Sequence, residues 1–233
     1  MRRSTLPVLL FAVVALVATA CGGDDKKEAS GGGQEALVGL FKVTPGTCSD
    51  AAVTSGSYFR MIQPGGKPVE GPYVPNGDSP CGDKTWSPMT PGSDGGLRTG
   101  AFQPQESQPF DAGGNGVSKK ITEPTKWFAV TFAIATNEVD PQTNTKAKQP
   151  EIFVTDGKLS GDLSAYAAAW NGQHFNQGAP KPGGDVPGLT AGPTGTYDSA
   201  TKKFVLDWTS QIVGGPFNNF TGTWHLEGTF EKA

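Results

Sequence analysis

The chain has 233 residues, of which 33 are glycine and 19 are proline, and its formal net charge is −3. This length is enough for one well-filled globular domain or at most two small ones. Glycine and proline both destabilise helices, so their abundance argues against a helical bundle and favours short strands joined by tight turns. The acidic balance argues against a nucleic-acid partner, because domains that bind nucleic acids present a basic face.

A short apolar segment follows two arginines at the start of the chain. Arg2 and Arg3 precede the largely apolar residues 6–20. This run is shorter than the about 20 apolar residues that a membrane-spanning helix needs. A basic start, a short apolar segment and small residues before a break are typical of an export signal. The sequence therefore predicts a signal peptide over residues 1–20.

The end of this segment carries a lipidation motif. The sequence Ala18-Thr19-Ala20-Cys21-Gly22 resembles the lipobox of bacterial lipoproteins, in which small residues precede a cysteine. In that family the cysteine takes a diacylglyceryl group, and cleavage makes it the new N-terminus. The resemblance implies that Cys21 is lipidated and that its two acyl chains hold the protein stably on the outer face of the cell membrane. The alternative is an ordinary cleaved signal peptide that leaves this cysteine free.

The residues after the motif are predicted to be a tether. Residues 22–34 contain no aromatic or β-branched residue, and such a segment buries too little apolar surface to order itself. We expect residues 21–35, which include the lipidated cysteine, to form a flexible tether of roughly 20 Å. A single β-rich domain is expected over residues 36–233.

Two further cysteines, Cys48 and Cys81, are expected to form a disulfide, because an exported chain folds in an oxidising compartment. The bond would constrain residues 63–96, where glycine and proline are frequent, and would contribute on the order of 3–4 kcal/mol in the chain-entropy model. The alternative, a redox role, needs a C-x-x-C pair or an activated thiol, and the sequence has no such pair.

Aromatic and β-branched residues at alternating positions predict the strands. They span residues 36–43, 57–63, 97–103, 126–136, 151–155, 158–170, 195–197, 203–211 and 222–230. Residues 162–170 are also compatible with a helix, but their alternation favours a strand. Strands with one apolar and one polar face are typical of antiparallel sheets. We therefore expect an all-β fold, a sandwich or flattened barrel of about 8–10 antiparallel strands with long Gly/Pro-rich loops.

Three turns are predicted between these strands. Asp140 and Asp198 each begin a D-x-x-T sequence, whose Asp and Thr side chains can cap the backbone amides of a hairpin tip. Asp156 and Gly157 predict a two-residue hairpin.

The chain contains no G-x-S-x-G, H-E-x-x-H, P-loop or C-x-x-C motif, so we expect no catalytic residue, no metal ligand and no cofactor. A zinc site would have to combine His174 and His225, which lack local ligand spacing. A calcium site is the other metal alternative, because aspartates on glycine-rich loops suit that ion, although their spacing matches no known repeat. The aspartates in question are Asp78, Asp83, Asp94 and Asp111.

Two groups of residues are candidates for a functional site. If residues 203–211 pair antiparallel with residues 222–230, Asp207, His225 and Glu227 share one face of the sheet. This polar cluster is either a proton-transfer group, in which carboxylates flank a histidine, or a solvated face with cross-strand polar pairs.

The second candidate is a ligand-binding segment that interleaves aromatic and amide side chains. Its residues are Trp170, Asn171, Gln173, His174 and Asn176. Amides both donate and accept hydrogen bonds, so they match sugar hydroxyls. The alternative is a strand and turn whose aromatic side chains belong to the core. Further along, Phe217 and Phe220 are expected to fold back into the core, with exposure to a partner as the alternative.

These features predict a lipid-anchored protein of the cell envelope, on the extracytoplasmic face of the cell membrane. Its non-catalytic β-domain would bind a ligand, a cell-wall glycan or another envelope protein. One alternative is a secreted glycan-active hydrolase that uses Asp207 and Glu227. The other is a haem or metal carrier, which the presence of only 2 histidines disfavours.

Overall fold

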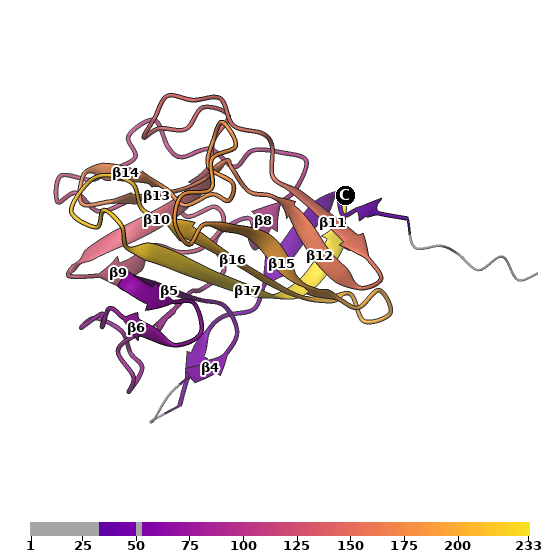
Figure 1. Ribbon diagram of the computed structural model, residues 1–233, viewed down its shortest axis with the longest axis horizontal. Helices are drawn as coiled ribbons and strands as arrows, with labels where there is room; N and C mark the ends of the chain where they lie inside the picture. Colours follow the sequence, from indigo (N-terminus) through magenta and orange to yellow (C-terminus); the bar gives the residue numbers. More distant parts are fainter. Residues whose placement is uncertain (1–32, 50–52) are drawn as a thin grey trace, which may run out of the picture. The chain divides into compact units, whose positions relative to one another are not determined.

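The computed structural model describes residues 33–49 and 53–233, and every regular element in these ranges is a β-strand (Figure 1). The predicted all-β fold is therefore confirmed. The strands form an eleven-stranded sheet, a four-stranded sheet and a two-stranded sheet. No helix that could cross a membrane occurs in this part of the chain. Cys21, the predicted signal peptide and most of the predicted tether lie outside the described residues.

The large sheet is antiparallel throughout, and β17 lies at its centre. Its main path runs through β1 (Glu35–Ala36), β11 (Glu151–Thr155), β12 (Lys158–Asp162), β15 (Ala191–Tyr197), β16 (Lys203–Gln211), β17 (Thr221–Lys232), β2 (Gly39–Val43) and β8 (Gly96–Arg98). One edge of β17 pairs with β16, and its other edge pairs first with β5 (Tyr58–Lys67) and then with β2. Two short strands, β6 (Gly71–Tyr73) and β7 (Ser87–Pro88), pair with β5.

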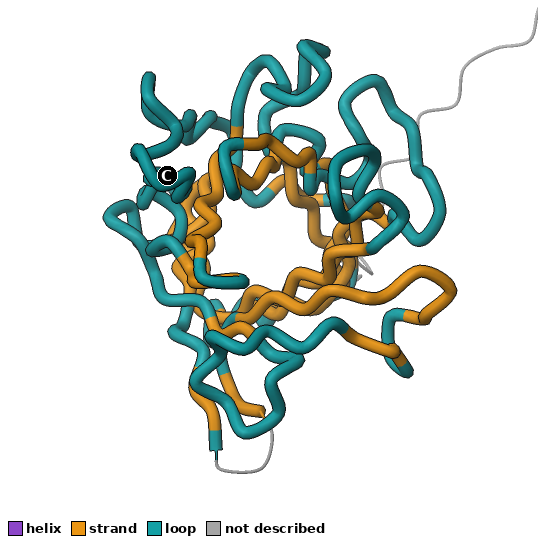
Figure 2. Tube along the Cα trace, turned by 90° about the vertical axis from the view of Figure 1, so that its left-hand side faces the viewer, coloured by secondary structure: helices purple, strands orange, loops and turns teal. Residues whose placement is uncertain are grey.

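The four-stranded sheet has the order β14 (Gln173–Asn176), β13 (Tyr166–Trp170), β10 (Val130–Thr136) and β9 (Thr125–Trp127). In Figure 2, the strands of the two larger sheets surround a common interior, which the core side chains fill. Gln103 links the two sheets. Its backbone amide donates to Oγ1 of Thr136 on β10, and its side-chain amide donates to the carbonyl of Gly96 on β8. The small sheet consists of β3 (Thr47–Cys48) and β4 (Val53–Ser55).

Alternation along β16 and β17 places one face of the large sheet in the core. On β16, Phe204, Leu206 and Trp208 are buried, whereas the residues between them are partly exposed. On β17, Trp224 and Leu226 are buried in the same way. The core is strongly aromatic, because the rings of Trp208 and Trp224 stack on each other and both meet the ring of Tyr166 on β13 edge to face. The outward residues of these two strands are consequently free to build a surface site.

Two predicted strands are wrong in extent, because each contains a turn. Residues 158–170 form β12 and β13, which belong to different sheets, with a turn in which the backbone amide of Ser164 donates to Oδ1 of Asp162. Residues 126–136 form most of the β9–β10 hairpin, whose turn residues Phe128 and Ala129 have positive φ angles of 49° and 65°. Apolar residues continue through both turns, so the period-two pattern did not reveal the change of direction.

Other predicted strands differ in their bounds. Residues 36–43 contain the end of β1 and the whole of β2, which lie in different parts of the large sheet. Residues 97–103 contain only the end of β8, because the chain then leaves the sheet to form the bridge between Gln103 and Thr136. The prediction at residues 195–197 is too short, since β15 begins at Ala191. The strands missed altogether are β3, β4, β6, β7 and β14, which are all four residues or shorter.

The predicted cross-link and the predicted turn chemistry are present. Cys48 and Cys81 form the disulfide. Asp156 and Gly157 form the two-residue turn between β11 and β12, with positive φ angles of 49° and 74°. Oδ1 of Asp198 accepts hydrogen bonds from the backbone amides of Ala200 and Thr201 in its own turn, and Oδ2 of Asp140 accepts one from the backbone amide of Thr143.

Candidate functional site

The outward faces of β5, β16 and β17 form the floor of a groove of about 620 Å³, which we call the outer groove. The β5–β6 hairpin and β15 contribute its sides. The residues that carry its chemistry are Tyr58, Arg60, Tyr73, Trp86, Asp207, Thr209, Thr223 and His225. They come from segments far apart in the sequence, and strand register brings them together.

Strand pairing places three of these residues in one row across the sheet. Asp207 on β16 lies opposite His225 on β17, and His225 lies opposite Tyr58 on β5. A second row, one pair further along, consists of Thr209, Thr223 and Arg60. Because side chains two residues apart point to the same face of a strand, the two rows form a continuous surface. The predicted antiparallel pairing of residues 203–211 with residues 222–230 is thus present, and it gives the polar cluster its geometry.

His225 lies between two carboxylates. Its Nδ1 is 2.7 Å from Oδ1 of Asp207, and its Nε2 is 3.6 Å from Oε2 of Glu227. Burial by itself would lower the pKa of His225, but the hydrogen bond and charge of Asp207, reinforced by Glu227, raise it above its ordinary value. Glu227 is itself fixed, since its Oε1 accepts a hydrogen bond of 2.6 Å from the backbone amide of Gly56.

Aromatic rings continue the row beyond His225. The Tyr58 ring stacks on the imidazole with a centroid distance of 4.4 Å and an interplanar angle of 12°. The rings of Trp86 and Tyr58 meet edge to face at a centroid distance of 4.4 Å. Burial, followed by the charge of Asp207, raises the pKa of Tyr58 to about 12, so its hydroxyl remains a hydrogen-bond donor at physiological pH.

Arg60, in the second row, contacts two aromatic rings. Its guanidinium carbon lies 3.3 Å from the ring centroid of Tyr73 and 4.0 Å from that of Trp86, which is cation–π geometry. One terminal nitrogen donates to Oγ1 of Thr85 at 2.9 Å. Trp86 is fixed in turn, because its indole nitrogen donates to Oδ2 of Asp83 at 3.0 Å. The aromatic walls of the groove are therefore preorganised.

The cluster combines one imidazole with two carboxylates on the outward face of β16 and β17. Asp207 and Glu227 lie beside opposite nitrogens of one imidazole ring, with Asp207 at hydrogen-bonding distance and Glu227 at 3.6 Å. The lining of the groove contains no serine or cysteine. Its hydroxyl groups belong to threonine and tyrosine side chains.

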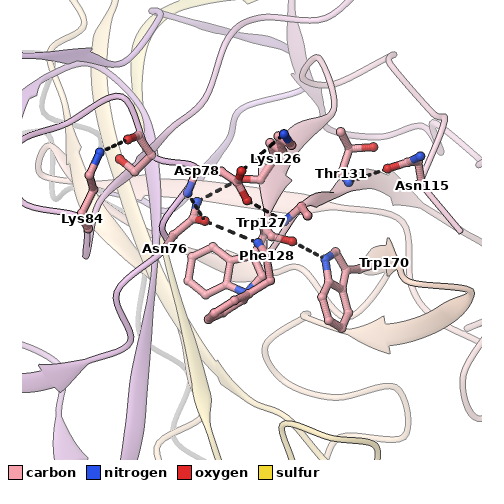
Figure 3. A network of polar contacts seen from close by, with 11 residues as sticks. Asn76, Asp78, Lys84, Asn115, Lys126, Trp127, Phe128, Thr131 and Trp170 are labelled. Carbon is pink, nitrogen blue, oxygen red and sulfur yellow. Dashed lines mark hydrogen bonds and ion pairs between the residues drawn. The ribbon is translucent and has the colours of Figure 1, made fainter. Parts of the chain in front are cut away.

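The segment predicted to bind a ligand lies elsewhere, in the β13–β14 hairpin. Asn171, with a positive φ of 49°, forms its turn together with Gly172, and the side chain of Gln173 is exposed. The Trp170 indole nitrogen donates to the carbonyl of Trp127 at 2.9 Å (Figure 3). The ring of His174 packs against Phe110, and burial lowers the pKa of His174 against the opposing charge of Asp140.

Asn176, the last residue of this segment, belongs to a buried polar network. Its Nδ2 donates to Oδ1 of Asp140 at 3.1 Å and to the carbonyl of Ser164 at 3.2 Å. Its own backbone carbonyl accepts a hydrogen bond of 2.7 Å from Nζ of Lys181, which also donates to Oγ of Ser210 at 2.7 Å. The side-chain amide nitrogen and the backbone carbonyl of Asn176 are thus both used in contacts inside the protein.

The carboxylates of Asp78 and Asp111 accept hydrogen bonds from backbone amides of the loops. Oδ2 of Asp78 accepts from the backbone amide of Ala129, and its Oδ1 lies 3.4 Å from Nζ of Lys126, as Figure 3 shows. Asp111 accepts from the backbone amides of Gly113 and Asn115. Among the described residues no group of three His, Cys, Asp or Glu side chains is arranged to hold a metal ion.

Sequence reasoning identified Asp207 and His225 but missed the aromatic half of the groove. Trp86 and Tyr73 lie in a segment rich in glycine and proline, where no periodicity indicates which way a side chain points. Phe217 and Phe220 fold back against the core, as predicted. In comparisons with known proteins, no family model, no curated protein and no solved structure matches this chain.

Proposed function

We propose that the protein is a lipid-anchored component of the cell envelope that binds a wall glycan in the outer groove and does not transform it. The observation that carries the binding is the continuous row in which Asp207, His225 and Tyr58 lie side by side in strand register. Charged groups, hydroxyls and ring faces alternate along this row and the neighbouring one.

Sugars match this surface for two reasons. Their C–H faces are apolar and pack on aromatic rings such as those of Tyr73 and Trp86. Their hydroxyls both donate and accept, so they pair with a carboxylate such as that of Asp207 and with a donor such as Tyr58. Asp207 retains this capacity, because 48% of its side chain is exposed. An open groove also accommodates a polymer, which extends beyond the site at both ends.

The anchor is part of the same proposal. A diacylglyceryl group on Cys21 would hold the β-domain at the membrane surface, and the tether would let it reach the wall. The support for the anchor is the lipobox resemblance at residues 18–22 and the apolar segment before it.

Glycan binding is tested with the full chain carrying Cys21→Ser, which needs no detergent, and with insoluble cell-wall glycan in a sedimentation assay. We expect Trp86→Ala and Asp207→Asn each to weaken retention at least tenfold, as for the central residues of other interfaces. Phe128→Ala is the matched control, because Phe128 is an exposed aromatic residue that does not line the groove. Equal retention of all four proteins, or none by the parent, would refute the glycan proposal.

Anchoring is tested separately by membrane fractionation of cells that express the full chain. The parent is expected in the membrane fraction and the Cys21→Ser variant in the soluble extracytoplasmic fraction. A variant that remains with the membranes would contradict lipidation at Cys21.

A further inference from the structure

A small cavity lies on the core side of β5 and β17, across the sheet from the outer groove and independent of its function. Its volume is about 40 Å³. The rings of Trp127, Phe132, Trp170, Phe175 and Phe217 form much of its wall. Gln177 is the single polar residue in the lining, and its amide is already used, since Oε1 accepts from Trp224 and Nε2 donates to the carbonyl of Asn176. No charged side chain lines this cavity.

Phe217 forms the outer part of the wall and belongs to the loop of residues 212–220 between β16 and β17. Its ring lies 5.4 Å from that of Trp170 and 5.5 Å from that of Phe220. The loop is bonded mainly to itself, because the amide of Gly214 donates to Oδ1 of Asn218 and the amide of Phe220 donates to the carbonyl of Phe217. Ring contacts, rather than strand pairing, therefore keep the Phe217 side chain in place.

Trp127 adds a buried, unpaired hydrogen-bond donor to the same wall. The chain has 5 tryptophans. Four of them donate their indole N–H to an acceptor: Trp86 to Asp83, Trp170 to Trp127, and Trp208 and Trp224 to Gln177. The Trp127 side chain is 2% exposed, and its Nε1 has no acceptor among the described residues. A water molecule needs two to four polar partners, which the apolar wall around Trp127 does not provide.

We propose that this cavity binds a small neutral molecule that consists of one aromatic ring and one hydrogen-bond acceptor. The ring of the ligand replaces the side chain of Phe217, and the acceptor receives the indole N–H of Trp127. The ligand is neutral, because a charge would be buried without a counter-charge. It needs the space of Phe217, because an apolar cavity that binds benzene measures about 150 Å³.

The test uses two probe compounds of the same shape, acetophenone and α-methylstyrene, in which a methylene group replaces the carbonyl oxygen. Each is titrated into the full chain carrying Cys21→Ser, with the five indole N–H resonances followed by ¹H–¹⁵N NMR. We expect acetophenone to bind roughly fivefold more tightly, which corresponds to one neutral hydrogen bond. It should move one indole resonance downfield, and Trp127→Phe identifies that resonance by removing it.

The variants separate the donor from the cavity. In Trp127→Phe, which keeps an aromatic wall, the two compounds should bind equally. Phe217→Trp fills the space that the ligand ring takes, so neither compound should bind this variant. Trp86→Ala in the outer groove should leave the affinity for both compounds unchanged. The proposal is overturned if no indole resonance of the parent responds, if both compounds bind the parent equally, or if Phe217→Trp still binds them.

Discussion

Nδ1 of His225 lies 2.7 Å from Oδ1 of Asp207, the residue directly opposite it on β16. This contact explains why a histidine whose side chain is only 16% exposed has a raised rather than a lowered pKa. The proton on His225 is stabilised by a hydrogen-bonded carboxylate, which outweighs the loss of hydration.

Replacing Asp207 should therefore lower the pKa of His225. In Asp207→Asn the charge disappears while the shape is kept, and burial then becomes the dominant effect, since Glu227 is more distant. We expect NMR titration of the imidazole carbon-bound protons to show the decrease at His225 and not at His174. Asp198→Asn, a loop substitution, is the control. An unchanged His225 titration would mean that Asp207 does not set this pKa.

The same contact predicts a pH-dependent stability. Because the folded-state pKa of His225 is raised, its contribution is complete below the unfolded value of roughly 6.5 and is lost as the pH rises through the folded-state value. The difference in the free energy of unfolding between the parent and Asp207→Asn should be largest at pH 5.5–6 and should shrink above neutral pH. Urea unfolding at several pH values measures it, and a difference that grows with pH would contradict the assignment.

Lys181 should have the opposite effect. Burial, opposed by the charge of Asp140, lowers the pKa of Lys181 to about 7, against roughly 10.4 in an unfolded chain. Between these values only the unfolded chain binds the proton, so the free energy of unfolding should rise with pH by up to about 1.4 kcal/mol per unit. Lys181→Met should remove this rise between pH 7 and 9, whereas Lys146→Met, at an exposed position, should not. Parallel profiles for all three proteins would show that Lys181 remains charged.

Replacing Asn176 tests whether this residue stabilises the fold or binds the ligand. In Asn176→Ala the buried groups of Asp140, Ser164 and Gly178 lose their partner. We expect the free energy of unfolding to fall by roughly 2–4 kcal/mol, with glycan retention by the folded protein unchanged. Gln173→Ala on the same hairpin should change stability by less than about 0.5 kcal/mol. If Asn176→Ala instead lost glycan retention without losing stability, the β13–β14 hairpin would be part of the glycan-binding site.

The disulfide should support both stability and the outer groove. Replacing Cys48 and Cys81 by alanine should lower the free energy of unfolding by about 3–4 kcal/mol, as estimated from the length of the closed loop. Calorimetry should record a lower Tm, and a reductant should shift the parent but not the double variant. Glycan retention should also fall, because Trp86 follows Cys81 closely in the same loop. Full retention in the double variant would show that Trp86 is positioned without the cross-link.

The sequence allowed the floor of the groove to be predicted, but not its walls. Alternation in residues 203–211 and 222–230 was regular, so the face shared by Asp207 and His225 followed from pairing alone. Tyr58 was within a predicted strand, yet its position over His225 depends on β5 pairing with β17, a contact between distant parts of the chain. The position of Trp86 depends on loop hydrogen bonds and on a cross-link, and no local pattern encodes either.

The break at residues 163–165 shows a second limit. Leu163 and Ala165 continue the apolar pattern of β12 into β13, so hydrophobic periodicity indicates one strand. What divides them is the capping of Ser164 by Asp162 and the bond from the Leu163 amide to the carbonyl of Ala179. The second of these contacts exists only in the assembled fold.

The central position of β17 has a consequence for how the protein assembles. Residues 221–232 provide hydrogen-bonding partners for three strands, β16, β5 and β2, so the large sheet cannot be completed until they are available. Until then, β2, β5 and β16 each lack the pairing partner that β17 provides. Pairing between segments that are remote in sequence is also slow. If the chain is exported before it folds, as proposed, β17 is the last of these strands to leave the cell. The large sheet would then be completed only outside the cell.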